Sequence, residues 1–297
     1  MNNEIFPDIG TIVNAAHGLT CVHDPQTARI RRMFAAAERR YDARVIAIGH
    51  SHMNCLLEAA FEAGITFEAI TLKGDGEGDQ ASLYKSDIVL GEGATVLSDH
   101  GFPDFTDRSK ALLYDSSGPI LSFIGGIRHI RLGMRVMEDP SDVPFDFVLA
   151  EAPHLPLEPG TEVIPYDAVY HVISRMFKKR LTLLPRIAQS APGRLVQFAP
   201  PPPVCDRHLQ RVLAKRNAKG ESPSGAKLPN RILRWKLWRL AATVLRQHAE
   251  ACGARFVDCP PEALDADGFM REELVRNVSH GNVAFGRLLL QQAQALS

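Results

Sequence analysis

Short apolar runs alternate with longer segments of helical periodicity along most of the chain. The apolar runs are rich in Val, Ile and Phe, which is typical of buried strands. We expect strands at 45–48, 66–72, 119–124, 194–199 and 255–258, a hairpin at 87–90 and 94–97, and helices at about 24–41, 53–63, 166–184, 232–251 and 285–295. Strands that alternate with helices predict a three-layer α/β/α sandwich with a central parallel sheet.

One large domain accounts for most of the predicted elements. Residues 1–42 are interpreted as an N-terminal extension with a helix, and 43–297 as a single α/β domain. Within that domain the segment at about 205–230 is a basic insertion. Its composition predicts a helix followed by a surface loop rich in Gly, Pro and Ser.

Composition narrows the classes of partner and compartment. The chain has 297 residues, with 34 Lys and Arg against 34 Asp and Glu, so no overall field favours nucleic acid or an anionic membrane. No signal peptide and no apolar run long enough to span a bilayer is recognised, and we therefore expect a cytoplasmic protein with no membrane partner. Five cysteines without a Cys-x-x-Cys pair support neither a disulfide framework nor a structural zinc site.

The stretch from Arg207 to Arg239 is rich in Arg and Lys and contains Trp235 and Trp238, a composition compatible with a phosphate-binding patch. The alternative is a solvated helical face with the tryptophans in the core. We favour this alternative, and predict no nucleic-acid partner, because the rest of the chain is balanced in charge. Binding of an anionic substrate, such as a phosphorylated sugar, stays open.

A serine follows the first predicted strand at a sharp turn. Gly49 and His50 end the apolar run, Ser51 comes next, and a helical pattern begins at Met53. In an open α/β sheet ligands bind at the carboxyl ends of the strands, where a helix start offers free N–H groups to an oxyanion. Ser51 is therefore a candidate nucleophile, with a helix N-cap as the alternative.

Three further polar clusters occupy comparable places. Gly125-Gly126-Ile127-Arg128-His129 follows the strand at 119–124, and Asn277-Val278-Ser279-His280-Gly281-Asn282 precedes the closing helix. The glycine run at 74–78, centred on Gly76, predicts either a turn or a close backbone approach to a ligand. The hypothesis requires the Ser51 turn, the double glycine and the His280 loop to meet in space.

With these blocks in this order, the chain from about 43 to 295 resembles the SGNH, or GDSL-type, hydrolase family. The resemblance implies a flavodoxin-like α/β/α architecture, with the nucleophile at Ser51 in the Gly-Asp-Ser block. It implies oxyanion donors in the Gly-x-Asn block at Gly125-Gly126-Ile127, and the base at His280 in the terminal Asp-x-x-His block. The other residues expected to bind substrate or the oxyanion are Gly76, Arg128, His129, His50 and Asn282.

Three positions depart from the family's motifs. His50 replaces a mainly structural Asp, Ile127 stands where an oxyanion Asn is expected, and Asn277 replaces the Asp that orients the base. Loss of one oxyanion donor costs a factor on the order of a hundred to a thousand in rate. A neutral Asn277 can hold the imidazole of His280 but cannot stabilise its charged form.

The favoured function is that of a serine esterase that acts on a small-molecule or carbohydrate O-acyl ester through a Ser51–His280 dyad, without a cofactor. An O-acyltransferase on the same fold and a decayed, non-catalytic binding protein are alternatives. The oligomeric state is not predicted.

A metal site is a further alternative. His50-Ser51-His52 is a His-x-His pair on which His100, His129 and His280 could converge, with Asp99 or Asp104. We disfavour it, and predict no metal, because no spaced set of carboxylate ligands accompanies the histidines.

Overall fold

A computed structural model describes residues 44–72, 88–91, 94–99, 109–110, 113–114, 118–125, 128–133, 144–218 and 230–296. The predicted N-terminal helix at 24–41 and the glycine run at 74–78 lie outside these residues.

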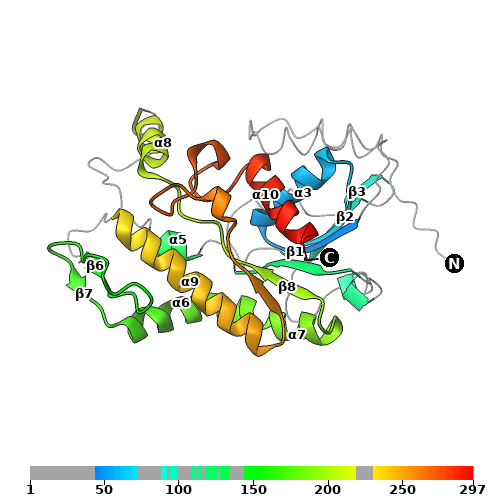
Figure 1. Cartoon of the computed structure of the whole chain (residues 1–297), viewed down its shortest axis with the longest axis horizontal. Coiled ribbons are helices and arrows are strands. Elements are labelled where there is room, and N and C mark those ends of the chain that lie inside the picture. Colours follow the sequence, from blue (N-terminus) through cyan, green and yellow to red (C-terminus); the bar gives the residue numbers. More distant parts are fainter. Residues whose placement is uncertain are drawn as a thin grey trace.

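A seven-stranded sheet forms the centre of the molecule, in the order β3-β4-β2-β1-β5-β8-β9 (Figure 1). Its strands are β1 (Arg44–Gly49), β2 (Thr66–Leu72), β3 (Ile88–Gly91), β4 (Ala94–Asp99), β5 (Ile120–Phe123), β8 (Leu195–Phe198) and β9 (Arg255–Val257). All neighbours pair parallel except β3 with β4, the two strands of the predicted hairpin. The five strands β2-β1-β5-β8-β9 follow the flavodoxin-like order, and the hairpin extends the sheet beyond β2.

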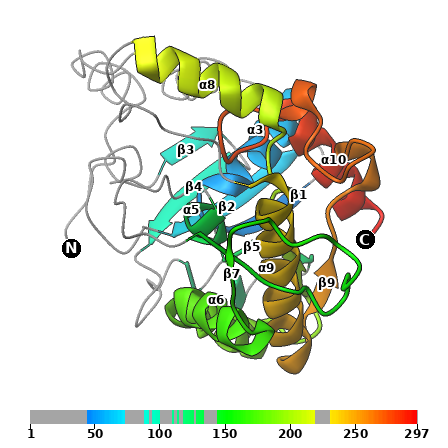
Figure 2. The same ribbon diagram turned by 90° about the vertical axis from the view of Figure 1, so that its left-hand side faces the viewer.

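Helices cover both faces of the sheet (Figures 1 and 2). One core contains side chains of α6 (Tyr166–Leu181), α7 (Leu183–Ser190) and α9 (Arg231–Ala251), and the other contains side chains of α3 (Asn54–Glu62) and α10 (Val283–Gln294). Strand β1 divides its residues between them, because Ile46 and Ile48 join the first core and Ala47 the second. The predicted three-layer α/β/α sandwich is confirmed.

The remaining short elements lie between these layers or at their ends. They are α5 (Arg128–Gly133), α8 (Asp206–Ala218), a small pair β6 (Phe145–Asp146) and β7 (Glu162–Val163), and the 3-10 turns η1 (Ser51–Met53), η3 (Pro261–Ala263) and η4 (Glu272–Leu274). Figure 2 shows α8 across one end of the molecule. None of the helices among the described residues has the length and apolarity needed to cross a bilayer.

The helix expected up to Pro185 is two helices instead, and this prediction was wrong. Helix α6 ends at Leu181, and α7 begins at Leu183 with Pro185 in its first turn. Proline is tolerated there because a first-turn N–H has no partner inside the helix. The apolar periodicity continues across the break, so it does not reveal the break.

The basic stretch is also not simply a solvated face. The side chains of Arg234 and Lys236 are 3% and 0% exposed. Arg234 pairs with Asp206 and donates to the carbonyl of Val204 at 2.6 Å. Both buried cations have carboxylate partners distant in sequence, Asp206 being partly exposed and Asp146 buried, and composition alone does not reveal such partners.

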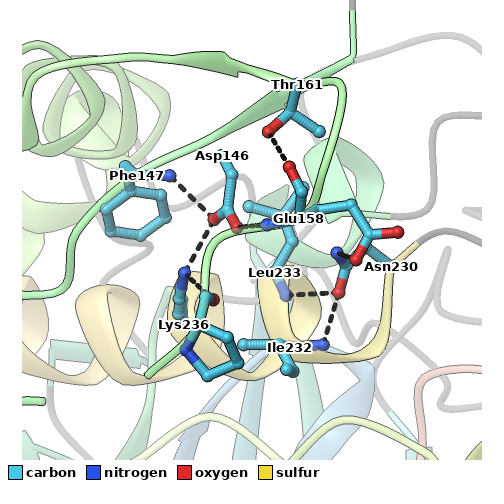
Figure 3. A network of polar contacts seen from close by, with 9 residues as sticks. Asp146, Phe147, Glu158, Thr161, Asn230, Ile232, Leu233 and Lys236 are labelled. Carbon is cyan, nitrogen blue, oxygen red and sulfur yellow. Dashed lines mark hydrogen bonds and ion pairs between the residues drawn. The ribbon is translucent and has the colours of Figure 1, made fainter. Parts of the chain in front are cut away.

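A buried ion pair fastens the β6–β7 segment to α9 (Figure 3). Lys236 Nζ lies 2.9 Å from Asp146 Oδ1, and neither side chain is exposed to solvent. The Asp146 carboxylate also accepts the backbone N–H groups of Phe147 at 2.7 Å and Glu158 at 2.9 Å. Asn230 begins α9 by accepting the N–H groups of two following residues, and its Nδ2 donates to Glu158.

Helices α3 and α10 touch at their backbones. A Cβ atom added at Gly286 would lie 1.9 Å from the carbonyl oxygen of Cys55, so only glycine allows this approach. Helix α3 follows the Ser51 turn and α10 follows the His280 loop. Their direct contact therefore fixes these two segments against each other.

Candidate active site

The site lies where the order of strands reverses, at the carboxyl ends of β1 and β5. Chain connections run from β1 to β2 on one side, whereas β5 pairs with β1 on the other, which makes this crevice the expected place for a ligand. The two strand ends approach closely, since a Cβ at Gly49 would lie 2.7 Å from Cβ of Phe123. Ser51 follows β1, and Gly125 follows β5.

The structure brings Ser51 and His280 together across 229 residues of sequence. Ser51 Oγ lies 2.8 Å from His280 Nε2, which is hydrogen-bond distance. Ser51 begins η1, and this turn leads directly into α3 without a side-chain cap, so the N-cap alternative is not what the serine does here. The hydroxyl is free to give its proton to the imidazole.

Asn277 fixes the tautomer of this imidazole. Its Oδ1 accepts the backbone N–H groups of Ser279 and His280, each at 3.0 Å, so the oxygen of the amide, not its NH₂, faces this loop. The same oxygen lies 3.0 Å from His280 Nδ1, and an oxygen in that place accepts the Nδ1–H. With the proton on Nδ1, Nε2 carries the lone pair that faces Ser51.

The imidazole of His280 sits in a setting that disfavours its charged form. Burial is the main cause that lowers its pKa to about 4, and the positive charge of Arg276 is the second cause. Arg276 pairs with Glu58 of α3, an ion pair that ties the loop to the helix behind Ser51. His280 is therefore neutral, and able to accept a proton, at all pH values well above 4.

His52, considered from the sequence only as a possible metal ligand, and Arg180, which the sequence did not single out, complete the surroundings. The ring of His52 stacks on the ring of His280, with centroids 4.6 Å apart and an interplanar angle of 22°. Arg180 of α6 donates from Nη1 to the carbonyl of Gly125 at 3.2 Å and lies near enough to lower the pKa of His52. No local pattern indicates either contact, because both contacts join distant parts of the chain.

The other predicted site residues are spread around this centre. Gly125 has φ of 124°, and a Cβ there would lie 2.9 Å from Leu245, so a side chain would be strained and crowded. His129 is 1% exposed, contacts Phe177 edge-on and has no hydrogen-bond partner on either ring nitrogen. Its burial lowers the pKa to about 3. Arg128 is the first residue of α5, and Gly126, Ile127 and Gly76 lie outside the described residues.

His50 and Asn282 flank the pair in sequence. His50 is half-buried with an extended backbone, and its carbonyl accepts the N–H of Met53 at 3.1 Å. Asn282 is the N-cap of α10, where its side chain accepts the N–H groups of Ala284 and Phe285. The structure thus gives Asn282 a capping contact and no contact with Ser51 or His280.

In the part of the chain that the structure describes, no three His, Cys, Asp or Glu side chains are grouped so that they could hold a metal ion. His52 and His280 stack face to face, which is not how two ligands of one ion are arranged. His100 and Asp104, which the metal hypothesis also invokes, lie outside the described residues.

Substitution of Asn277 by Asp is expected to raise kcat/KM for an ester about tenfold to a hundredfold at pH 7. Because Asn277 already holds the required tautomer of His280, the gain would come from the added negative charge. The carboxylate would raise the pKa of His280 from about 4 and stabilise the imidazolium. Steady-state rates over pH 4–8 measure both effects. Asn277→Ala is the control and should lower the rate, while a rate for Asn277→Asp at or below that of the wild type would contradict this account.

Protonation of buried histidines is expected to destabilise the protein as the pH falls from 6.5 toward 4. Burial is the main cause of the lowered pKa values of His52, His129 and His280. The unfolded chain therefore binds more protons, and each group removes about 1.4 kcal/mol per pH unit below the unfolded value of about 6.5. Urea unfolding at pH 7, 6 and 5 measures the slope. His129→Phe should reduce this slope, and an unchanged slope would exclude His129 as a cause.

Comparisons with known proteins give only distant likenesses. No protein-family model matches the sequence, and no curated protein matches it. One similar solved structure is a GDSL-like lipase from Bacteroides thetaiotaomicron, with a TM-score of 0.35 and 8% identity over 91% of this chain and 98% of that one. Another is the periplasmic domain of a lipopolysaccharide acetyltransferase from Salmonella ser. Paratyphi A, with a TM-score of 0.40 and 10% identity over 97% and 96%. Likenesses this distant indicate no activity.

Proposed function

We propose that the protein is an SGNH-like serine hydrolase that cleaves O-acyl esters with Ser51 as nucleophile and His280 as general base. The observation that carries the proposal is the 2.8 Å contact between Ser51 Oγ and His280 Nε2, with Asn277 Oδ1 at 3.0 Å from the other ring nitrogen. A nucleophile, a base and a third group that orients the base form the arrangement that serine catalysis needs.

In the first half of the proposed reaction, Ser51 Oγ attacks the ester carbonyl carbon while Nε2 of His280 takes the hydroxyl proton. The tetrahedral intermediate then collapses, its bond to the alcohol oxygen breaks, and Nε2 returns the proton to the leaving alcohol. The acyl group remains on Ser51. A water molecule, deprotonated by the same nitrogen, then attacks the acyl carbon. The bond from this carbon to Ser51 Oγ breaks, Nε2 returns the proton to Oγ, and the acid leaves.

Stabilisation of the oxyanion is assigned to backbone donors and a nearby positive charge. Ser51 heads the helical segment formed by η1 and α3, where the first N–H groups have no acceptor within the helix. The turn at Gly125 follows β5, the strand next to β1. The carbonyl of Gly125 accepts a hydrogen bond from Arg180. We expect the Ser51 N–H, the Gly125 turn and the Arg180 charge to supply the stabilisation that the sequence departure at Ile127 removes.

Labelling with a fluorophosphonate tests the proposal. Ser51 Oγ would attack phosphorus and expel fluoride, and mass spectrometry of a digest should place the phosphonyl group on Ser51. The acid-unfolded protein is the control and should not react. Absence of a Ser51 adduct on the folded protein would support the alternative of a decayed site and overturn the proposal.

The acceptor of the acyl group is decided by a second measurement. The unlabelled wild-type protein is incubated with an activated acetyl ester in the presence and absence of a sugar alcohol. The products distinguish hydrolysis from acyl transfer. A hydrolase releases acetate at the same rate in both. An acyltransferase forms an acetylated sugar at the expense of acetate.

A further inference from the structure

An acyl-transfer reaction at this site must place a positive charge on His280, and among the described residues the hydrogen-bond partners of its ring are Ser51, Ser279 and Asn277, none of which is a carboxylate. Asn277 holds the ring through a neutral amide oxygen. Burial and the charge of Arg276 both oppose protonation of the ring. A serine protease uses a buried carboxylate for this purpose, so a different group has to carry part of the task here.

His52 lies where it could stabilise the protonated ring of His280. It follows Ser51 in the same turn, and its side chain is buried under the His280 ring. The two rings lie face to face at 4.6 Å and 22°. An aromatic face within about 6 Å of a cation attracts it through the ring quadrupole, more strongly when water is excluded.

The attraction requires His52 to remain uncharged when His280 is protonated. Burial lowers the pKa of His52 well below its usual value, and the charges of His280, His50, His129 and Arg180 lower it further. His280, with a pKa of about 4, takes the proton first. The groups facing His52 are thus all potential cations, and they keep its ring neutral.

We propose that His52 is a positioning residue that holds the His280 ring by stacking and stabilises its imidazolium form, in place of the carboxylate absent at position 277. This inference rests on the proposed function. Its contribution is expected to be about threefold to thirtyfold in the rate of the step that protonates His280. An aromatic ring without titratable atoms should replace His52, whereas an aliphatic chain of similar size should not.

The test compares His52→Phe and His52→Leu by their second-order rates of fluorophosphonate labelling and their rates of p-nitrophenyl acetate hydrolysis. We expect the Phe variant to stay within about threefold of the wild type and the Leu variant to lose about tenfold. The pH at which labelling falls to half should be unchanged in the Phe variant and lower in the Leu variant. Equal rates and equal pH profiles for both variants would overturn the inference.

A double-mutant cycle that combines His52→Leu with Asn277→Asp shows whether His52 stabilises the charge on His280 or only packs against its ring. The added carboxylate supplies the charge, so His52→Leu should cost less in the Asn277→Asp protein than in the wild type. An equal cost in both backgrounds indicates packing alone and overturns the inference. His52→Gln, which is planar, polar and not aromatic, replaces the Leu variant if that variant does not fold. Failure of the wild type itself to label would instead overturn the proposed function.

Discussion

Replacement of Ser51 by alanine is expected to lower kcat/KM for an acyl ester by at least about a thousandfold, and His280→Ala should do the same. The two groups lie 2.8 Å apart and act as one unit, because the hydroxyl is a poor nucleophile until the imidazole takes its proton. The double variant should therefore be no slower than either single variant. Initial rates with p-nitrophenyl acetate, at enzyme concentrations that detect residual activity, measure all three.

Ser279→Ala is the matched control for this experiment. Ser279 Oγ also lies against the His280 ring, 2.9 Å from Nδ1, but on the side away from Ser51. Asn277 still occupies Nδ1 in its absence, so we expect a loss of no more than about tenfold, the scale of one neutral hydrogen bond. If Ser279→Ala were inactive while Ser51→Ala kept most of its activity, the assignment of the nucleophile would have to be reversed. Equal rates in the wild type and Ser51→Ala would remove the nucleophile altogether.

Lys236→Met is expected to reduce the free energy of unfolding by about 3–5 kcal/mol, because it leaves the Asp146 carboxylate buried without its cation. Lys236 also donates to the carbonyl of Pro156 at 3.1 Å, so a second buried acceptor loses its partner. Urea unfolding monitored by tryptophan fluorescence measures the change. Both side chains of this ion pair are fully buried, so water cannot solvate the charge that remains when its partner is removed.

Two further variants show whether charge is the cause. Asp146→Asn combined with Lys236→Met removes the unpaired charge while the amide oxygen can still accept a backbone N–H, so part of the stability should return. Arg231 belongs to the same helix as Lys236, and Arg231→Met removes its ion pair with Asp267, whose side chains are 40% and 65% exposed. We expect it to cost no more than about 1 kcal/mol. A similar loss for Arg231→Met and Lys236→Met would contradict the role assigned to burial.

The parallel sheet could be predicted because each of its central strands is an apolar run, and burial on both faces leaves that signature. The positions of Ser51 and His280 could be predicted because they follow a strand and precede a helix at recognisable turns. The partner contacts could not be predicted. The sequence presents His52 only as half of a His-x-His pair beside Ser51, and only the fold places its ring on His280.

Buried charge was the second feature hidden from the sequence. Lys236 and Arg234 belong to a helix whose basic residues suggested a solvated face, yet their partners Asp146 and Asp206 are distant in sequence. The pair β6 and β7 has two residues in each strand, too short for any period to be recognised. The localisation and the absence of a nucleic-acid partner stay predictions.

The backbone contact between Gly286 and Cys55 also bears on how this scaffold could be re-engineered. Ser51 and His280 lie immediately before the two helices that meet there, and the elements from β2 to η4 lie between these helices in the sequence. Loops in that middle part could be exchanged or lengthened while the two reacting groups keep their mutual register. Substrate preference could then be changed through loops other than the Gly125 turn, which together with Arg180 is assigned to the oxyanion.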